Sequence, residues 1–263
     1  MRGNVWLVRG VLIFSQLAAL IVVAIIGQTK PQENLAITSM PAIPNNITSP
    51  IIPTQKVTNT IPIKQITKVK FVASFQPKYE ISWAHPNNYG QRYSQDVNGR
   101  PVNNQPIIVI HETVNSATSA INNFQTPHTN ENAQVSYHTL IKLDGTVIYI
   151  VPREFRAFGA GNSVFRGVNG IETVKTHLQF PPSVNNFAYH VAFETPPDGR
   201  NNSKIHRGYT QVQYNSLAWL IAQSSVPEAR ITTHKAVDRS GKRIDPRSFN
   251  FQSFLMVLRS YRR

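Results

Sequence analysis

The chain runs Ile107-Ile108-Val109-Ile110-His111-Glu112-Thr113 over residues 107–113. Four consecutive β-favouring aliphatic residues predict a strand that is buried on both faces. A strand of this kind leaves the core at its end, so we expect His111 at the rim of a sheet, beside a cleft. A single histidine after an apolar run is more often structural than functional. Its role therefore depends on residues found further along the chain.

Strand and helix patterns continue on the C-terminal side of this stretch. Asp144-Gly145 separates two β-favouring runs, which is a strong hairpin signal. Thr210 and Gln213 match a capping box at the start of a helix. The expected strands cover 135–143, 146–151, 188–194 and 230–233, and the expected helices cover 116–125, 210–224 and 249–259. This succession predicts an α/β fold in which helices flank a mixed central β-sheet, within one catalytic domain that spans residues 106–263.

The N-terminal part of the chain has a different composition. An uncharged run at 11–27 follows two arginines, which predicts a signal peptide or membrane anchor within residues 1–27. Prolines recur through residues 28–70, as in a semi-rigid Pro/Thr-rich linker. We expect residues 71–105 to form an extension that packs on the catalytic domain. The basic N-terminal flank predicts export to the periplasm or cell envelope, with residues 11–27 as a membrane attachment if they are not cleaved.

The overall composition restricts the possible partners and chemistry. A formal net charge of +14 favours an anionic partner, such as nucleic acid, anionic lipid or an acidic cell-wall polymer. No nucleic-acid-binding motif is present, so we expect no nucleic-acid partner. The chain contains no cysteine, which excludes disulfides, thiolate zinc ligands and a cysteine nucleophile.

A second histidine follows a β-favouring run late in the chain. His234 comes directly after residues 231–233, and Asp245 follows eleven residues later, before a proline. Two histidines and one carboxylate are a sufficient ligand set for a catalytic zinc ion, since such sites keep a fourth position open. The spacing alone does not exclude a solvated loop that happens to contain a histidine.

Residues 106–258 resemble the zinc-dependent N-acetylmuramoyl-L-alanine amidases, the type shared with phage lysozyme-like amidases and peptidoglycan recognition proteins. The resemblance is carried by residues 107–113, 135–151, 157–161, 191–194 and 234–246, together with Phe249. It implies that His111, His234 and Asp245 are the ligands of a Zn²⁺ cofactor. It also implies hydrolysis of the amide bond between N-acetylmuramic acid and L-alanine in peptidoglycan or muropeptides. We expect a monomer.

The resemblance implies further site residues. Glu194 falls where one branch of the family keeps a catalytic glutamate, and Tyr137 falls where the other branch keeps a tyrosine beside the metal. Arg243, or Lys242 in its place, would supply a cation near the metal. Gly159 departs from the family pattern, which usually has histidine at this position of an Ala-aromatic-His-Ala-Gly stretch.

For three residues near these positions we expect structural or peripheral roles. His138 should point to the opposite sheet face from its neighbour Tyr137 and form structural hydrogen bonds. His190 is expected to be structural, and Glu112 to lie at the rim of the site. Two alternatives to the amidase remain: a peptidoglycan-binding module of the same fold without catalysis, and a membrane-anchored basic tether that binds no metal.

Overall fold

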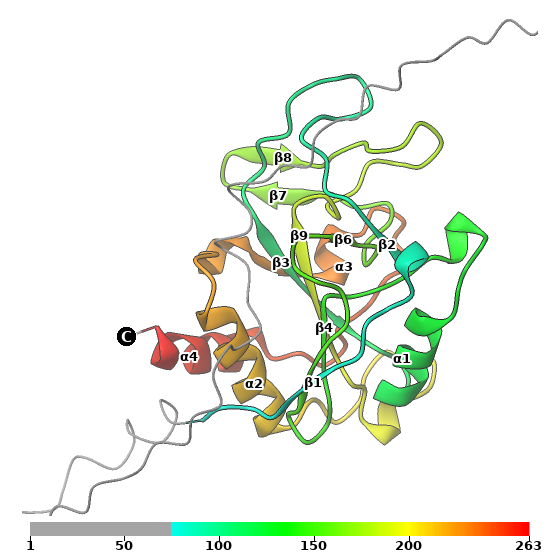
Figure 1. The fold of residues 1–263 in the computed structure, drawn as a ribbon. Helices are drawn as coiled ribbons and strands as arrows, with labels where there is room; N and C mark the ends of the chain where they lie inside the picture. The colour runs from blue at the N-terminus through cyan, green and yellow to red at the C-terminus, as the bar shows by residue number, and fades with distance from the viewer. Residues whose placement is uncertain (1–74, 263) are drawn as a thin grey trace, which may run out of the picture.

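A six-stranded mixed sheet lies at the centre of residues 75–262, which are the residues that the computed structural model describes (Figure 1). Its strands, in spatial order, are β1 (Tyr79–Ile81), β5 (Val147–Tyr149), β4 (Thr139–Ile141), β9 (Ala188–Phe193), β3 (Ile107–Glu112) and β10 (Ile231–Thr233). Only β4 and β5 pair antiparallel in this sheet. The predicted α/β class with a mixed sheet is confirmed. The expected targeting element and linker, 1–27 and 28–70, lie outside the described residues.

Strand β3 occupies the position that its sequence predicts. All six of its residues are buried, because β9 and β10 pair with it on either side and the sheet is covered on both faces. Parallel strands with both faces covered are continuously apolar, which explains why no polar residue interrupts 107–110. The prediction of a doubly buried strand is confirmed.

The hairpin predicted at Asp144-Gly145 joins β4 to β5. Gly145 has a φ of 85°, a left-handed conformation that glycine adopts without steric strain. The Asp144 carboxylate accepts a hydrogen bond from the Thr146 N–H at 2.9 Å, and the Lys142 N–H donates to the Thr146 carbonyl oxygen at 2.9 Å. Both strands are shorter than the predicted ranges, but their pairing is antiparallel as expected.

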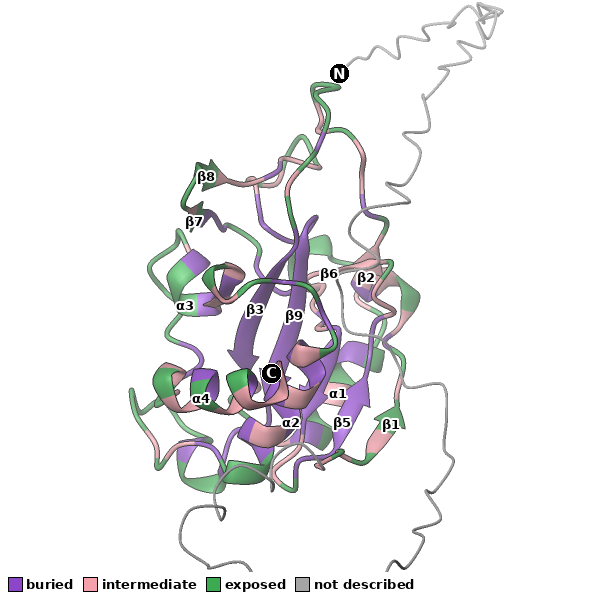
Figure 2. Cartoon of the chain, turned by 90° about the vertical axis from the view of Figure 1, so that its left-hand side faces the viewer, coloured by how far each residue is buried: buried purple, intermediate pink, exposed green. Residues whose placement is uncertain are grey.

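Helices α2 (Gln211–Ala222) and α4 (Phe251–Tyr261) cover one face of the sheet. The predicted capping box of α2 is present: the Thr210 hydroxyl accepts from the Gln213 N–H, and the Gln213 side chain accepts from the Thr210 N–H. Leu217 and Leu220 pack against Ile108 of β3 in the main core. In Figure 2 buried and exposed residues alternate along α4, whereas α2 is mostly buried and is exposed only in its first two residues.

The opposite face carries helix α1 (Ala117–Gln125), where Phe124 packs against Leu140 and Ile148 of the sheet. Short elements and connecting loops complete the cover on this side. They are β2 (Tyr89–Gly90), which pairs with β6 (Arg156–Ala157), the hairpin of β7 (Phe165–Gly167) and β8 (Gly170–Glu172), and the one-turn helix α3 (His234–Val237). Short 3-10 turns lie at Pro86–Asn88, Glu131–Ala133, Pro197–Gly199 and Glu228–Arg230.

The segment expected to pack on the domain, 71–105, contributes β1 to the central sheet itself. Tyr79 pairs with Val147 in parallel register at the sheet edge. Arg92 of the same segment is buried and donates to the carbonyl oxygens of Asn186, at 2.8 Å, and Ala188, at 2.9 Å. Within residues 75–262, no helix has the length and apolar character needed to cross a bilayer.

Candidate metal centre

His111, His234 and Asp245 converge at one edge of the sheet. The Nδ1 atom of His234 lies 3.0 Å from Oδ2 of Asp245, and Nδ1 of His111 lies 3.4 Å from the same oxygen. All three residues are buried. Within the described part of the chain they form the one group of histidine and acidic side chains whose possible ligand atoms all lie within 4.8 Å of one another.

The strand arrangement brings the two histidines together. His111 is near the carboxyl end of β3, and His234 directly follows β10, which pairs parallel to β3 with Thr233 opposite Ile110. The carboxyl ends of parallel strands meet at the same sheet edge, where open α/β sheets commonly bind ligands. Asp245 returns to this edge because the Lys235 N–H donates to its carbonyl oxygen at 2.9 Å.

The donor set fits a zinc ion. Zinc bonds to histidine and carboxylate ligands of about 2.0–2.2 Å place neighbouring donor atoms of a tetrahedron about 3.4 Å apart, close to the separations of 3.0 and 3.4 Å found here. Nδ1 of His111 is buried without a hydrogen-bond partner among the described residues. Burial lowers the pKa of His111 to about 4, which keeps the imidazole neutral. Burial alone would raise the pKa of Asp245, but the two facing imidazoles outweigh it and hold that pKa below its usual range.

Tyr137 and Arg243 lie beside this group. The Tyr137 ring stacks on the His111 imidazole, with ring centroids 4.4 Å apart and planes 28° from parallel. Burial raises the pKa of the Tyr137 hydroxyl, Asp245 raises it further, and the positive charge of Arg243 opposes both. The positive charge of Arg243 acts on both Tyr137 and His111. The Asp238 carboxylate shapes this loop by accepting the N–H groups of both basic residues.

The structure does not bring Glu194 into the ligand group. Its carboxylate follows strand β9 and accepts hydrogen bonds from the N–H groups of Ala117, at 3.1 Å, and Leu143, at 3.0 Å. It also pairs with Arg200 at 3.0 Å. These contacts join the start of α1 to the β4–β5 turn. The catalytic role expected for Glu194 stays a prediction.

Two contacts of the site were missed in the sequence. Nε2 of His111 lies 2.9 Å from Nδ1 of His190, and Glu112 forms a buried ion pair with Arg247, with Nε 2.7 Å from Oε1. The sequence predicts only a structural role for His190. Its contact with His111 runs between two strands, so only the pairing of β3 with β9 could have revealed it. His138 has the structural role expected, because its Nδ1 accepts from the His190 N–H at 2.9 Å.

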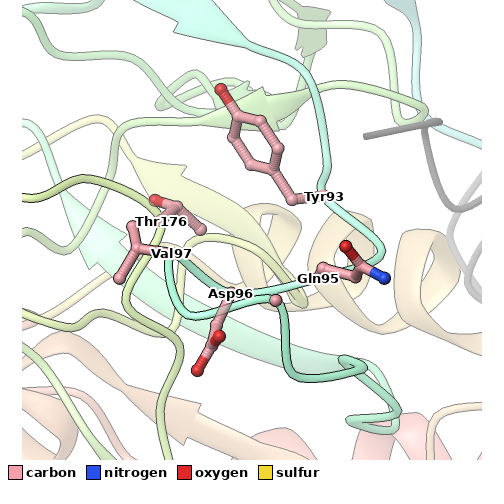
Figure 3. Close-up of a pocket in the computed structure, with 6 residues that line it drawn as sticks. Tyr93, Gln95, Asp96, Val97 and Thr176 are labelled. Atoms are coloured by element: carbon pink, nitrogen blue, oxygen red, sulfur yellow. The ribbon is translucent and has the colours of Figure 1, made fainter. Parts of the chain in front are cut away.

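A separate hollow of about 270 Å³ contains none of the candidate residues (Figure 3). Its lining residues are Tyr93, Gln95, Asp96, Val97, Gly99 and Thr176. Arg156 forms part of the surroundings, since its guanidinium lies 5.0 Å from the centre of the Tyr93 ring and donates to the Thr176 hydroxyl. The hollow therefore lies apart from the three converging ligands.

Several solved structures are similar to this chain. Among solved structures, the chain is similar to a selenomethionine derivative of AmpD, with 20% identity over 73% of this chain and 99% of that one and a TM-score of 0.46. It is also similar to the N-acetylmuramoyl-L-alanine amidase LysC from Clostridium intestinale, with 21% identity over 70% of this chain and 99% of that one and a TM-score of 0.43. A third similar structure is AmiD from E. coli in complex with the substrate anhydro-N-acetylmuramic acid-L-Ala-D-gamma-Glu-L-Lys. Its identity is 19% over 58% of this chain and 57% of that one, and its TM-score is 0.44.

No curated protein sequence matches the chain. A family model described as N-acetylmuramoyl-L-alanine amidase matches residues 99–248. The matched region contains all six residues that the resemblance implied, which are His111, Tyr137, Glu194, His234, Arg243 and Asp245. Because this region is more than half of the 263 residues, the chain belongs to the N-acetylmuramoyl-L-alanine amidase family.

Proposed function

We propose that this peptidoglycan amidase holds a zinc ion between His111, His234 and Asp245. Membership of the family gives the reaction, which is hydrolysis of the amide bond between N-acetylmuramic acid and L-alanine. The observation that supports zinc is the convergence of two imidazole nitrogens and one carboxylate oxygen, whose possible ligand atoms all lie within 4.8 Å of one another. Three protein ligands are typical of catalytic zinc sites, which leave the fourth position to water or substrate.

Tyr137 and Arg243 can each be assigned a role beside this ion. Zinc held by such a set lowers the pKa of a water molecule and polarises a carbonyl group. Tyr137, stacked on His111, would place its hydroxyl as a hydrogen-bond donor to the negative charge that develops on the amide oxygen. Arg243 would add positive charge on the same side, since its field already acts on Tyr137. Its exposed position leaves it free to contact an anionic substrate.

Digestion of purified peptidoglycan tests this function directly. The enzyme loaded with zinc should release stem peptides that begin with a free L-alanine amine and should leave glycan strands whose N-acetylmuramic acid carries a free lactyl carboxylate. Mass spectrometry of the products identifies the bond that is cut. The same digestion after removal of the metal with a chelator should give no products, and added zinc should restore them. A peptidoglycan-binding module without catalysis would leave the polymer uncut in every sample.

Glu194 requires its own test. We expect Glu194→Gln to retain zinc and to lose about 10²–10⁴-fold in turnover, the usual contribution of a group that accepts a proton from the attacking water and returns it to the leaving amine. Turnover and zinc content of the purified variant are the measurements. Arg200→Met is the control, since it removes the ion pair at 3.0 Å and leaves the carboxylate in place. Full activity of Glu194→Gln, or an equal loss in both variants, would limit Glu194 to joining α1 and the β4–β5 turn.

We also propose that the enzyme acts outside the cytoplasm, in the periplasm or cell envelope. The support is the uncharged run at residues 11–27 behind Arg2 and Arg9, followed by the proline-containing stretch. A linker of this kind would let the catalytic domain reach the wall while residues 11–27 stay in the membrane. The high net positive charge suits work in an anionic wall.

A further inference from the structure

We propose that His190 is a positioning residue that holds His111 in the tautomer and orientation needed for zinc, and that Gly159 provides the space for it. This inference rests on the proposed zinc site. His190 was expected from the sequence to be merely structural. Its contacts instead connect it to the first candidate ligand.

The geometry of His111 determines which of its nitrogens must carry the proton. Its Nδ1 faces Asp245 at 3.4 Å, so this nitrogen is the one that can bind the metal. A neutral imidazole that binds a metal through Nδ1 carries its proton on Nε2. Nε2 lies 2.9 Å from Nδ1 of His190, so the proton is donated to the lone pair on that atom. Metal-bound histidines almost always donate their second N–H group, because this bond fixes the ring.

Only one ring nitrogen of His190 has a hydrogen-bond partner among the described residues. Its side chain is fully buried, and its other ring nitrogen, Nε2, has no hydrogen-bond partner among the described residues. An imidazole present only to fill the core would be expected to satisfy both nitrogens, because buried polar atoms nearly always find partners. The bond to His111 is therefore the side-chain hydrogen bond that accounts for a histidine at position 190.

Gly159 faces the ring of His190. A Cβ atom at position 159 would lie 2.6 Å from both Cγ and Nδ1 of that imidazole, far inside van der Waals contact. The backbone cannot easily retreat, because the Phe158 N–H donates to the Ser136 hydroxyl and the Ala160 N–H donates to the Asn185 side chain. The glycine that departs from the family pattern thus leaves the room in which His190 reaches His111.

Zinc affinity, measured by competition with a chelator, tests the proposal. His190→Leu removes the acceptor and should weaken zinc binding about 10–100-fold. His190→Asn should stay within a few-fold of the parent, because its amide oxygen can occupy the place of Nδ1. Gly159→Ala should weaken binding through the clash, whereas Gly161→Ala is a matched control: a Cβ there has nothing within 4 Å. In the His190→Leu background, Gly159→Ala should add no comparable loss.

A measurement on the unmutated enzyme avoids any effect of substitution on folding. Nitrogen NMR should find the His111 proton on Nε2 and a scalar coupling across the hydrogen bond to Nδ1 of His190. The proposal is overturned if that proton sits on Nδ1, if folded His190→Leu binds zinc as tightly as the parent, or if Gly159→Ala and Gly161→Ala behave alike. Failure of the unmutated enzyme to bind zinc would instead refute the proposed metal centre, which separates the two hypotheses.

Discussion

His234→Ala should reduce peptidoglycan hydrolysis to the background rate and should leave the purified protein without stoichiometric zinc. The substitution removes one of only three protein donors, and two donors cannot hold the ion in an open tetrahedral site. Asp245→Ala should have the same effect, since its Oδ2 lies 3.0 Å from His234 and 3.4 Å from His111. Elemental analysis of metal content and release of soluble fragments from cell walls are the two measurements.

A histidine outside the centre provides the control. His177 is 45% exposed in its side chain and lies against Glu131, away from the ligand group. His177→Ala should therefore keep both zinc and activity. Undiminished hydrolysis by His234→Ala would show that the metal centre is assigned to the wrong residues, even if the enzyme cleaves the expected bond.

Arg247→Met should lower the free energy of unfolding by about 3–5 kcal/mol, the usual effect of removing one partner from a buried ion pair. The side chains of Glu112 and Arg247 are 0% and 2% exposed, and they meet through two hydrogen bonds, at 2.7 and 3.2 Å. Arg247 also donates to the carbonyl oxygens of Gly199 and Ser203, both at 2.6 Å. Loss of the guanidinium leaves the buried carboxylate facing the His206 imidazole, whose Nε2 lies 3.3 Å from Oε2, instead of a permanent cation. Urea denaturation measures the change.

A double variant separates the unpaired charge from other effects. Glu112→Leu combined with Arg247→Met should be more stable than Arg247→Met alone, because no uncompensated carboxylate remains. The exposed pair of Arg259 and Glu228 is the matched control, and Arg259→Met should change stability little. If Arg247→Met and Arg259→Met lower the free energy of unfolding equally, the buried Glu112–Arg247 pair contributes no more to stability than an exposed pair. A further loss of zinc affinity in Arg247→Met is expected, since Arg247 is two residues from Asp245.

Local patterns in the sequence predicted most of the fold. The aliphatic run before His111 is apolar because both of its faces are covered, and the Asp144-Gly145 turn and the Thr210 cap depend on neighbouring residues only. The edge strand β1 was not predicted. Its three residues show no strong pattern, and it is a strand because β5 offers it a free edge. Pairing of this kind is a property of the assembled sheet.

The individual candidate ligands could be predicted from the sequence, one residue at a time. His111, His234 and Asp245 each belong to a stretch with family resemblance, and the structure brings the three together. Contacts between residues of different stretches could not be predicted. The Glu112–Arg247 pair joins residues 135 positions apart, and the bond from His111 to His190 joins residues 79 positions apart. Neither partner has a sequence pattern that distinguishes it from a rim or core residue.

Strand β1 and the buried Arg92 together decide where a recombinant catalytic fragment can begin. A polypeptide shortened to residue 106 would lack β1 and would expose one edge of β5. The carbonyl oxygens of Asn186 and Ala188, just before and at the start of β9, would also lose the guanidinium that satisfies them. The shortest autonomous unit therefore starts upstream of Tyr79, some way before the region that the family model covers, and expression plasmids or crystallisation trials should keep that segment.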